Sequence, residues 1–536
     1  MINTVFVLII AAVVFWLGYR FYAVKIESIW GVDPKRPTPA VAQFDGVDYV
    51  PAKNWLVLFG HHFSSIAGAG PIVGPILACC LWGWLPAMLW VVFGSIFLGG
   101  IHDFGSLMIS VREEGVSIGD IAAKSISGKA KLILSIFTWL ALILVIAVFA
   151  YLCADTFATQ PKIVLPSLGL IPIAMIVGLA LYRFKLNSSV VTVLGLLSLG
   201  ALIALGEFFP IVVGGDSRMI WILVLLVYCF FASTLPVNLL LQPRDYLSSF
   251  LLFGGIALGV IGIFISHPNM NSSAFTTFKS PMGYLWPMMF ITVACGANSG
   301  FHSLIASGTT SKQLANERDA KKITFGGMLL EGFLAATVII ILVGGLSSSD
   351  LSMHVAKKTS PVSLYGLSFG NITSPIVGKW GSFFALLLLN AFILTTLDTA
   401  TRITRYITEE LFGVKNRYVS TFIVVILGGW LALGKDSAHN PLWQKIWPAF
   451  GASNQLVAAL ALLVISCWLL SKGKPTLYSL IPAFFMLSTS LTALILQIGA
   501  YLKSREYVLM ITSFVLVCSA LFLVKEVWLT FKKIKV

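Results

Sequence analysis

The sequence predicts an all-α, polytopic membrane protein with about fifteen transmembrane helices. Three observations predict this fold class. Hydrophobic residues make up 58% of the 536 residues and charged residues only 11%, whereas soluble domains carry roughly 25% charged residues. Apolar runs of about 18 residues or more, long enough to cross a bilayer, recur along the chain. These runs are continuous rather than alternating, which indicates helices and not a β-barrel.

The predicted spans follow one another with short connections. They are 3–24, 55–81, 84–111, 132–156, 167–182, 189–208, 219–241, 247–266, 285–310, 322–346, 380–407, 419–434, 448–470, 476–501 and 506–530. The first lacks a basic leader and a small-residue cleavage site, so we expect a retained helix and not a signal peptide. The longest connections are 25–54, a Pro-rich charged cytoplasmic linker, and 347–379, a loop expected on the outer surface or over an entry path.

The charge distribution predicts the orientation. A net charge of +14 would suit a nucleic-acid partner, but the basic residues lie mainly in connections between spans. With the N-terminus outside, most of the 36 Lys and Arg residues fall on the cytoplasmic side. We therefore expect a multi-pass protein of the cell membrane, with the N-terminus outside, the C-terminus inside, lipid as its surroundings and no nucleic-acid partner. The sequence leaves the oligomeric state open.

Helix-breaking residues interrupt the second span. Its stretch "GHHFSSIAGAGPIVGP" contains Gly68, Gly70 and Gly74 together with Pro71 and Pro75. Each proline removes a backbone donor, and glycine leaves helical geometry readily. Unpaired backbone groups are tolerated at membrane depth only where they face protein, water or a ligand. The stretch therefore predicts an unwound segment beside a cavity; the alternative is close helix packing on a glycine face with a proline kink.

Two further spans carry breakers. The seventh contains Pro236 and Pro243 in "ASTLPVNLLLQPRDY", and the ninth contains Asn298 and Ser299 in "ACGANSGFHSLIASGTT". Spans two and seven are five helices apart and run in opposite directions, which is the pattern of an inverted-repeat transporter. The expected divisions are an N-terminal helix and linker (1–54), a core (55–410) with repeats 55–210 and 218–410, and additional helices (411–536).

Several long stretches resemble the carbon starvation protein A (CstA) family of membrane transporters. They are "GHHFSSIAGAGPIVGPILA", "WGWLPAMLWVVFGSIFLGGIHDFGSLMISVREEGVSIGDI", "STLPVNLLLQPRDYL", "ACGANSGFHSLIASGTTSKQL", "LLEGFLA", "LTTLDTATRITRYI" and "WPAFGASNQL". The family is similar to the amino acid–polyamine–organocation superfamily, whose core is a LeuT-like five-plus-five inverted repeat. The resemblance implies this core and the uptake of small nutrients, with pyruvate and peptides the substrates named for the family.

Ionisable residues inside the spans predict a polar layer. Each costs roughly 2.5–3.5 kcal/mol at a helix centre, so such residues mark partners or pathways. Five spans place them roughly 12 Å from their cytoplasmic ends at 1.5 Å per residue. With His61, which adjoins the break, the set is His61, His62, His102, Asp103, His302, Glu331 and Asp398. Imidazole and carboxyl groups in a partly dry cavity exchange protons near neutral pH, so we expect a role in ion coupling or gating.

Each of these residues also has a simpler interpretation. Asp398 precedes Arg402 by four residues and suits an ion pair on one helix. Glu331 suits a contact with backbone groups of a neighbouring helix, and His302 suits a hydrogen-bonded core position. His102 and Asp103 point about 100° apart on a helix, so their partners are expected on other spans.

Two polar pairs lie outside this layer. Arg244 and Asp245 of "QPRDY" are expected at the cytoplasmic end of span seven, as a gate or anchor or as a plain interfacial charge pair. Asn454 and Gln455 of "GASNQL" lie outside the predicted core and are expected to pack between helices.

The break also predicts where substrate binds. Amides at the start of an outer half-helix, together with its dipole, attract a carboxylate. The expected substrate-binding residues are Gly68, Ala69, Gly70, Pro71, Gly74, Asn298 and Ser299. Resemblance to LeuT-like transporters suggests a sodium site from the hydroxyls of Ser303, Ser307, Thr309 and Thr310, although a helix C-terminal turn explains the same residues. We expect a proton as the coupling ion, with sodium as the alternative, and no cofactor.

The sequence therefore predicts a secondary active transporter that imports a small carboxylate, pyruvate ahead of short peptides, by ion-coupled alternating access. A peptide uptake transporter of the same fold is the alternative, and a passive channel and a membrane-embedded metalloenzyme are rivals from other classes. No Walker-type G-x-x-x-x-G-K motif is present, and the seven cysteines form no C-x-x-C pair. With no H-E-x-x-H helix either, we expect neither an enzyme nor a metal site.

Overall fold

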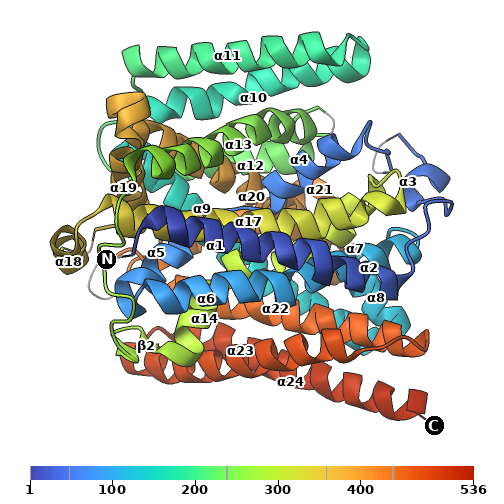
Figure 1. Cartoon of the computed structure of the whole chain (residues 1–536). Helices are drawn as coiled ribbons and strands as arrows, with labels where there is room; N and C mark the ends of the chain where they lie inside the picture. The colour runs from blue at the N-terminus through green and yellow to red at the C-terminus, as the bar shows by residue number, and fades with distance from the viewer. Residues whose placement is uncertain (1, 47–48, 237–238, 358, 437–439, 536) are drawn as a thin grey trace.

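The chain folds into one bundle of side-by-side helices. The computed structural model describes residues 2–46, 49–236, 239–357, 359–436 and 440–535. Within these residues the only strands are an antiparallel pair, β1 (Lys279–Ser280) and β2 (Gly283–Tyr284). Figure 1 shows that most of the long helices run roughly along one direction and that the two termini lie at opposite ends of the bundle.

The helices of the first half, up to residue 266, are α1 (Thr4–Leu17), η1 (Gly18–Ala23), α2 (Val24–Trp30), α3 (Pro39–Ala42), α4 (Trp55–Ile66), α5 (Gly70–Trp82), α6 (Trp84–Gly94), η2 (Ser95–Gly99), α7 (Gly100–Arg112), α8 (Ile118–Ser125), α9 (Gly128–Thr159), η3 (Pro161–Ile163), α10 (Val164–Gly178), η4 (Leu179–Arg183), α11 (Ser188–Phe208), α12 (Ser217–Thr234) and α13 (Leu241–Ser266).

The helices of the second half are η5 (Leu285–Met289), α14 (Phe290–Thr292), α15 (Ala294–Ala297), α16 (Phe301–Gly308), η6 (Thr310–Lys312), η7 (Glu317–Asp319), α17 (Ala320–Gly345), α18 (Ser348–Ala356), α19 (Pro361–Val377), η8 (Gly378–Trp380), α20 (Gly381–Phe412), α21 (Arg417–Leu433), α22 (Trp443–Ser471), α23 (Leu477–Ser504) and α24 (Tyr507–Lys535).

Polar caps fix where several spans begin. The first amides of a helix have no partner within the helix, and an Asn or Ser oxygen just before it supplies one. The side chain of Asn54 accepts from Val57 N at 3.0 Å at the start of α4, and Ser127 accepts from Ala130 N at 3.1 Å at the start of α9. Asn416 caps α21 in the same way. The polar segments that the sequence predicts as connections between spans therefore lie at the ends of the helix bundle.

Ion pairs gather the basic connections at one end of the bundle, called here the basic end. It holds residues 24–46 and 49–54 with the segments 112–131, 312–322 and 405–417. Arg112 Nε donates to Glu317 Oε1 at 2.9 Å, and Lys321 Nζ lies 2.5 Å from Glu27 Oε2. The backbone of the 24–54 segment also bonds directly to η6, through Val50 N and Lys312 O at 3.1 Å.

Twelve helical segments of the described chain are long and apolar enough to cross a membrane, or thirteen with the bent pair α4–α5. The chain is therefore a multi-pass membrane protein. The expected count of about fifteen is not confirmed, because two predicted spans do not qualify. Span 285–310 is divided into short helices, and span 419–434 forms α21, which has only 17 residues.

The segment 347–379 is not the loop that the sequence predicts. It contains α18 and α19, and α19 packs against α13, α17 and α20. Val362, Tyr365, Phe369 and Ile372 are buried at helical spacing. The serines and glycines between them suggested a loop; instead, Gly370 allows α20 to approach so closely that a Cβ there would overlap the Ser382 side chain.

The structure has two interrupted helices, at the second and ninth predicted spans. Helices α4 and α5 are separated by three residues and bent by 44°. Helix α15 ends at Ala297 and α16 begins at Phe301. The predicted interruption of span seven is wrong: α12 ends at Thr234 and α13 begins at Leu241, so Pro236 lies in the connection between two helices. Residues 237 and 238 of that stretch lie outside the described residues.

The two interrupted helices lie next to each other in the core. Helix α5 packs against α15, and α4 packs against α16, α13, α17 and α20. Helix α7 packs against both α16 and α17, while the two 32-residue helices α9 and α20 pack together beside them. Helices α10 and α11 form a hairpin on the outside of the bundle, at the top of Figure 1.

Candidate transport site

The break in the second span is closed by side chains. A Cβ at Gly68 would lie 2.8 Å from Thr396 Oγ1 and 2.9 Å from Phe149, and a Cβ at Gly70 would overlap Cys295. Gly70, Pro71 and Gly74 belong to the first turns of α5, so the unwinding is shorter than predicted. Neighbouring atoms thus pack closely against Gly68, Gly70 and Gly74, and none of these residues lines either of the two cavities described below. Their role in substrate binding stays a prediction.

The second break is held by Asn454 of α22. Its backbone oxygen accepts from Gly300 N at 3.1 Å, and its Oδ1 accepts from Phe301 N at 3.1 Å. Its Nδ2 donates to Ser299 Oγ at 3.1 Å. The neighbouring Asn298 is fully buried and contacts the sulfur of Met486. The sequence marked Asn454 as unusual but placed it outside the core, because no local pattern shows which helix faces it.

Four ionisable side chains form a fully buried chain, called here the sealed network. His62 Nε2 lies 3.1 Å from Asp103 Oδ2, and His302 Nδ1 lies 3.8 Å from the same oxygen. On its other side, His302 Nε2 lies 3.0 Å from Glu331 Oε2. The sealed network joins α4, α7, α16 and α17, so ionisable residues that the sequence places at one depth in these spans contact one another. Their role in ion coupling stays a prediction.

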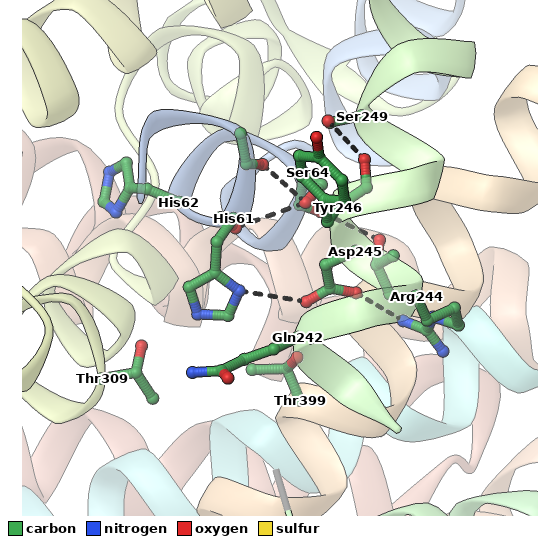
Figure 2. A network of polar contacts seen from close by, with 12 residues as sticks. His61, His62, Ser64, Gln242, Arg244, Asp245, Tyr246, Ser249, Thr309 and Thr399 are labelled. Carbon is green, nitrogen blue, oxygen red and sulfur yellow. Dashed lines mark hydrogen bonds and ion pairs between the residues drawn. The ribbon is translucent and has the colours of Figure 1, made fainter. Parts of the chain in front are cut away.

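A second chain, called here the cavity network, starts from the adjacent residue of α4. His61 Nδ1 lies 3.3 Å from Asp245 Oδ2, and Arg244 donates to Asp245 Oδ1 at 3.0 Å (Figure 2). Arg244 also pairs with Asp398, which accepts from the hydroxyl of Tyr228 at 2.6 Å and from that of Thr399 at 3.4 Å. This network joins α4 to α13, α20 and α12.

These contacts correct two sequence interpretations. Asp398 pairs with Arg244 and not with Arg402, which instead donates to the carbonyls of Ala232 and Leu235 at the end of α12. Arg244 and Asp245 are 2% and 0% exposed in the first turn of α13, so they are no interfacial pair.

His102 lies apart from both networks. It is fully buried, and its ring nitrogens have no hydrogen-bond partner among the described residues. Across that same part of the chain, no three His, Cys, Asp or Glu side chains are arranged to hold a metal ion.

Open space lies toward the two ends of the bundle. A cavity of about 310 Å³ at the basic end reaches His61, Asp245 and Thr399, and it is called here the basic-end cavity. Arg402 and Lys312 also line it. A second cavity of about 590 Å³ lies between the ends of α5 and α23 and the starts of α19 and α22, at the opposite end.

Three charged residues form a cluster at the mouth of the basic-end cavity. Lys131 Nζ lies 2.7 Å from Asp120 Oδ1 and also pairs with Glu410. Burial raises the pKa of Asp120, but hydrogen bonds from Lys131 and Ser117 outweigh it and leave the pKa below its usual range. This carboxylate therefore stays ionised at neutral pH.

The four hydroxyls of the possible sodium site are engaged within the chain. Ser303, Ser307 and Thr309 donate to carbonyls three or four residues earlier, at 2.6 to 3.0 Å. Thr310 Oγ1 lies 2.9 Å from His62 Nδ1, at the end of the sealed network. The sodium site stays a prediction.

A solved structure shares this fold. The crystal structure of MhsT in complex with L-phenylalanine aligns with a TM-score of 0.51 over 88% of this chain and 99% of that chain. The sequence identity is only 14%, so the likeness concerns the LeuT-like fold alone. The wider relation to the amino acid–polyamine–organocation superfamily stays a prediction.

Relatives of known function are transporters. The peptide transporter CstA of Escherichia coli (strain K12) is 32% identical over 572 residues, which cover 92% of this chain and 81% of the relative. The pyruvate/proton symporter BtsT of the same strain is 32% identical over 597 residues, which cover 93% and 82%. The sequence profile described as "Carbon starvation protein CstA" matches residues 3–362 and 345–493. The chain therefore belongs to the carbon starvation protein CstA family.

Proposed function

We propose that this protein is a secondary active transporter that imports a small carboxylate nutrient, pyruvate ahead of short peptides, by proton-coupled alternating access. The observation that carries the proposal is that two interrupted helices lie next to each other and that the first of them brings two histidines into two buried networks. His61 belongs to the cavity network and His62 to the sealed network. Interrupted helices side by side are typical of transporters that bind solute near the middle of the membrane. Buried imidazole and carboxyl groups are typical of proton relays.

The two cavities support alternating access. One reaches inward from the basic end and the other from the opposite end, while Phe149, Thr396 and Cys295 close the first break between them. In this proposal the break opens toward one cavity at a time, and the backbone amides near Gly68 then meet the substrate carboxylate. Asn298 and Ser299 of the second break would supply further hydrogen bonds.

We infer two five-helix repeats that differ from the division predicted at 55–210 and 218–410. The first is α4–α5, α6–α7, α9, α12 and α13, and the second is α14–α16, α17, α20, α21 and α22. Equivalent helices pack alike, which supports this division. Helix α5 packs against α17 as α16 packs against α7, and α9 packs against α21 and α22 as α20 packs against α12 and α13. The hairpin α10–α11 is then an insertion.

The orientation follows from the basic end. Positively charged connections stay in the cytoplasm. We therefore propose that the basic end faces the cytoplasm, so that the N-terminus is outside and the C-terminus inside. On this orientation, the basic-end cavity opens to the cytoplasm.

Transport by the purified protein in liposomes tests the proposal. Labelled pyruvate is offered under an inward proton gradient and, separately, an inward sodium gradient, with alanyl-alanine as competitor. We expect accumulation under the proton gradient that a protonophore abolishes. Accumulation under sodium alone would identify sodium as the coupling ion. Uptake of labelled alanyl-alanine in a parallel assay, with no pyruvate uptake, would favour a peptide transporter. Equilibration without accumulation would favour a channel, and loss of a chemical activity with a chelator would favour the metalloenzyme.

A further inference from the structure

His61 has an unused ring nitrogen beside the basic-end cavity. The residue is 8% exposed and lines this cavity. Both ring nitrogens are buried and neither makes a hydrogen bond among the described residues; Nδ1 lies 3.3 Å from Asp245 Oδ2, whereas Nε2 has no such ion-pair contact. Figure 2 shows that this second nitrogen is directed away from Asp245, toward the side where Thr309 and Thr399 lie. Both threonines line the same cavity.

The charges of the cavity network are unbalanced without a proton on His61. Asp245 and Asp398 are two carboxylates, and Arg244 supplies one positive charge between them. With neutral imidazole the network carries one net negative charge, which repels an entering anion. With imidazolium the network is neutral, and Nε2–H becomes a charge-assisted donor on the cavity side. Protonation and anion binding are therefore linked at one ring.

The remaining charged groups around His61 are engaged elsewhere or attract anions. Asp120 and Glu410 share Lys131 at the mouth, and His62, His302 and Glu331 face the sealed network. Tyr228 donates to Asp398. Arg402 and Lys312 line the cavity, and neither has a carboxylate partner in the part of the chain that the structure describes. The lining thus draws an anion inward and leaves His61 as the group that gains a proton beside it.

We propose that His61 is the residue at which a carboxylate substrate and a proton are coupled, with Asp245 as its positioning residue. In the state open toward the basic end, the substrate carboxylate leaves the amides near Gly68 and accepts a hydrogen bond from Nε2–H of the imidazolium, with Thr399 and Thr309 beside it. One proton is taken from the solution for each carboxylate bound, so the occupied site adds no net charge. This inference rests on the proposed function, and it applies equally to pyruvate and to the C-terminal carboxylate of a short peptide.

The inference differs from a role for His62. None of the four side chains of the sealed network lines the basic-end cavity. Of the two adjacent histidines, only His61 lines it. Any proton on His62 moves among Asp103, His302 and Glu331 without touching a solute there. The two histidines therefore separate experimentally, although they are adjacent in sequence.

Binding and proton uptake by the purified protein test the inference. In weakly buffered solution with a pH indicator, we expect wild type to take up about one proton per pyruvate bound. Its affinity should then fall about tenfold per pH unit once His61 is neutral in the free protein. For His61→Gln we expect weaker binding with no proton uptake and no pH dependence. His354→Gln, far from the site in α18, is the matched control and should keep both.

A second variant covers the case in which His61→Gln does not fold. Asp245→Asn removes the partner charge of the imidazolium, so we expect the pH midpoint of binding to move to lower pH while proton uptake persists below it. Unchanged proton uptake in His61→Gln, or an unchanged midpoint in Asp245→Asn, would overturn the inference and leave the proposed function intact. If wild type binds neither pyruvate nor alanyl-alanine, the proposed function fails first.

Discussion

His61 and His62 are consecutive residues of α4 that belong to two separate networks. His62 Nε2 lies 3.1 Å from Asp103 Oδ2, and His61 Nδ1 lies 3.3 Å from Asp245 Oδ2. Helical geometry explains the separation, because successive side chains point about 100° apart. Helix α4 thereby joins α7 on one side and α13 on the other. A movement of α4 would change both sets of contacts at once, which gives the pair a place in the proposed transport cycle.

The sealed network should matter for coupling more than for folding. We expect His62→Ala to reduce accumulation under a proton gradient by tenfold or more, because the chain from Asp103 to Glu331 loses its first member. Exchange of internal for external pyruvate at equal pH should persist, because exchange needs no net proton movement. Uptake and exchange in the same liposomes measure this. Wild-type accumulation at matched protein abundance would remove His62 from the mechanism.

Two neighbouring amides of α22 should respond in opposite ways. Asn454→Leu removes the acceptor of Phe301 N and the donor to Ser299, so we expect a loss of about 1–3 kcal/mol of stability per unpaired buried group. Gln455 is equally buried, but its amide has no hydrogen-bond partner among the described residues. Gln455→Leu should therefore leave the melting temperature unchanged or raise it. Equal losses in both variants would contradict the role of Asn454 at the second break.

The packing of Gly70 in α5 against Cys295 in α15 should be disrupted by the addition of a single methyl group. Gly70→Ala places a Cβ on the Cβ of Cys295, and overpacking of this kind costs about 1–3 kcal/mol. Because both Cβ atoms take part, Cys295→Gly in the Gly70→Ala background should restore part of the stability and of transport. The control is Gly254→Ala in α13, where a Cβ meets open space. Thermal unfolding of the three variants and wild type measures the effect; failure of the second change to restore anything would argue against this contact.

The buried pair of Arg244 and Asp398 should show strong coupling. Arg244→Met leaves two carboxylates unpaired, and breaking a buried pair costs about 3–5 kcal/mol. Adding Asp398→Leu removes one of the two charges, so the double variant should be more stable than Arg244→Met alone. We expect neither variant to transport, because the charge balance around His61 is lost. A double-mutant cycle on unfolding, with the uptake assay beside it, tests both statements, and additive effects on unfolding would contradict the pairing.

The fold was predictable where it depends on local composition. Long apolar runs bounded by capping residues such as Asn54 and Ser127 gave most of the spans. The run of glycines and prolines from Gly68 to Pro75 gave the first interrupted helix. The segment 347–379 was mistaken for a loop because its burial is supplied by packing against α13, α17 and α20, which the composition of the segment itself does not show.

The sequence predicted which ionisable residues belong to the candidate site, but not which of them contact one another. Depth along each helix brought His62, Asp103, His302 and Glu331 to one level, and they do meet. Depth does not fix the rotation of a helix about its axis. The same reasoning therefore could not tell that Asp398 faces Arg244 and not Arg402, or that Asn454 reaches the second break.

A native cysteine that lines the cavity opposite the basic end allows the width of this cavity to be followed by chemical modification. Cys80, on the last turn of α5, is partly exposed and lines this cavity. Cys153 and Cys229 are buried in the core, and the exposed Cys518 of α24, which does not line the cavity, is replaced by serine in this experiment. A water-soluble maleimide added from that side would modify Cys80 while the cavity is wide and more slowly once α5 moves inward. Modification rates in the presence and absence of solute would thus follow the conformational cycle through a native thiol.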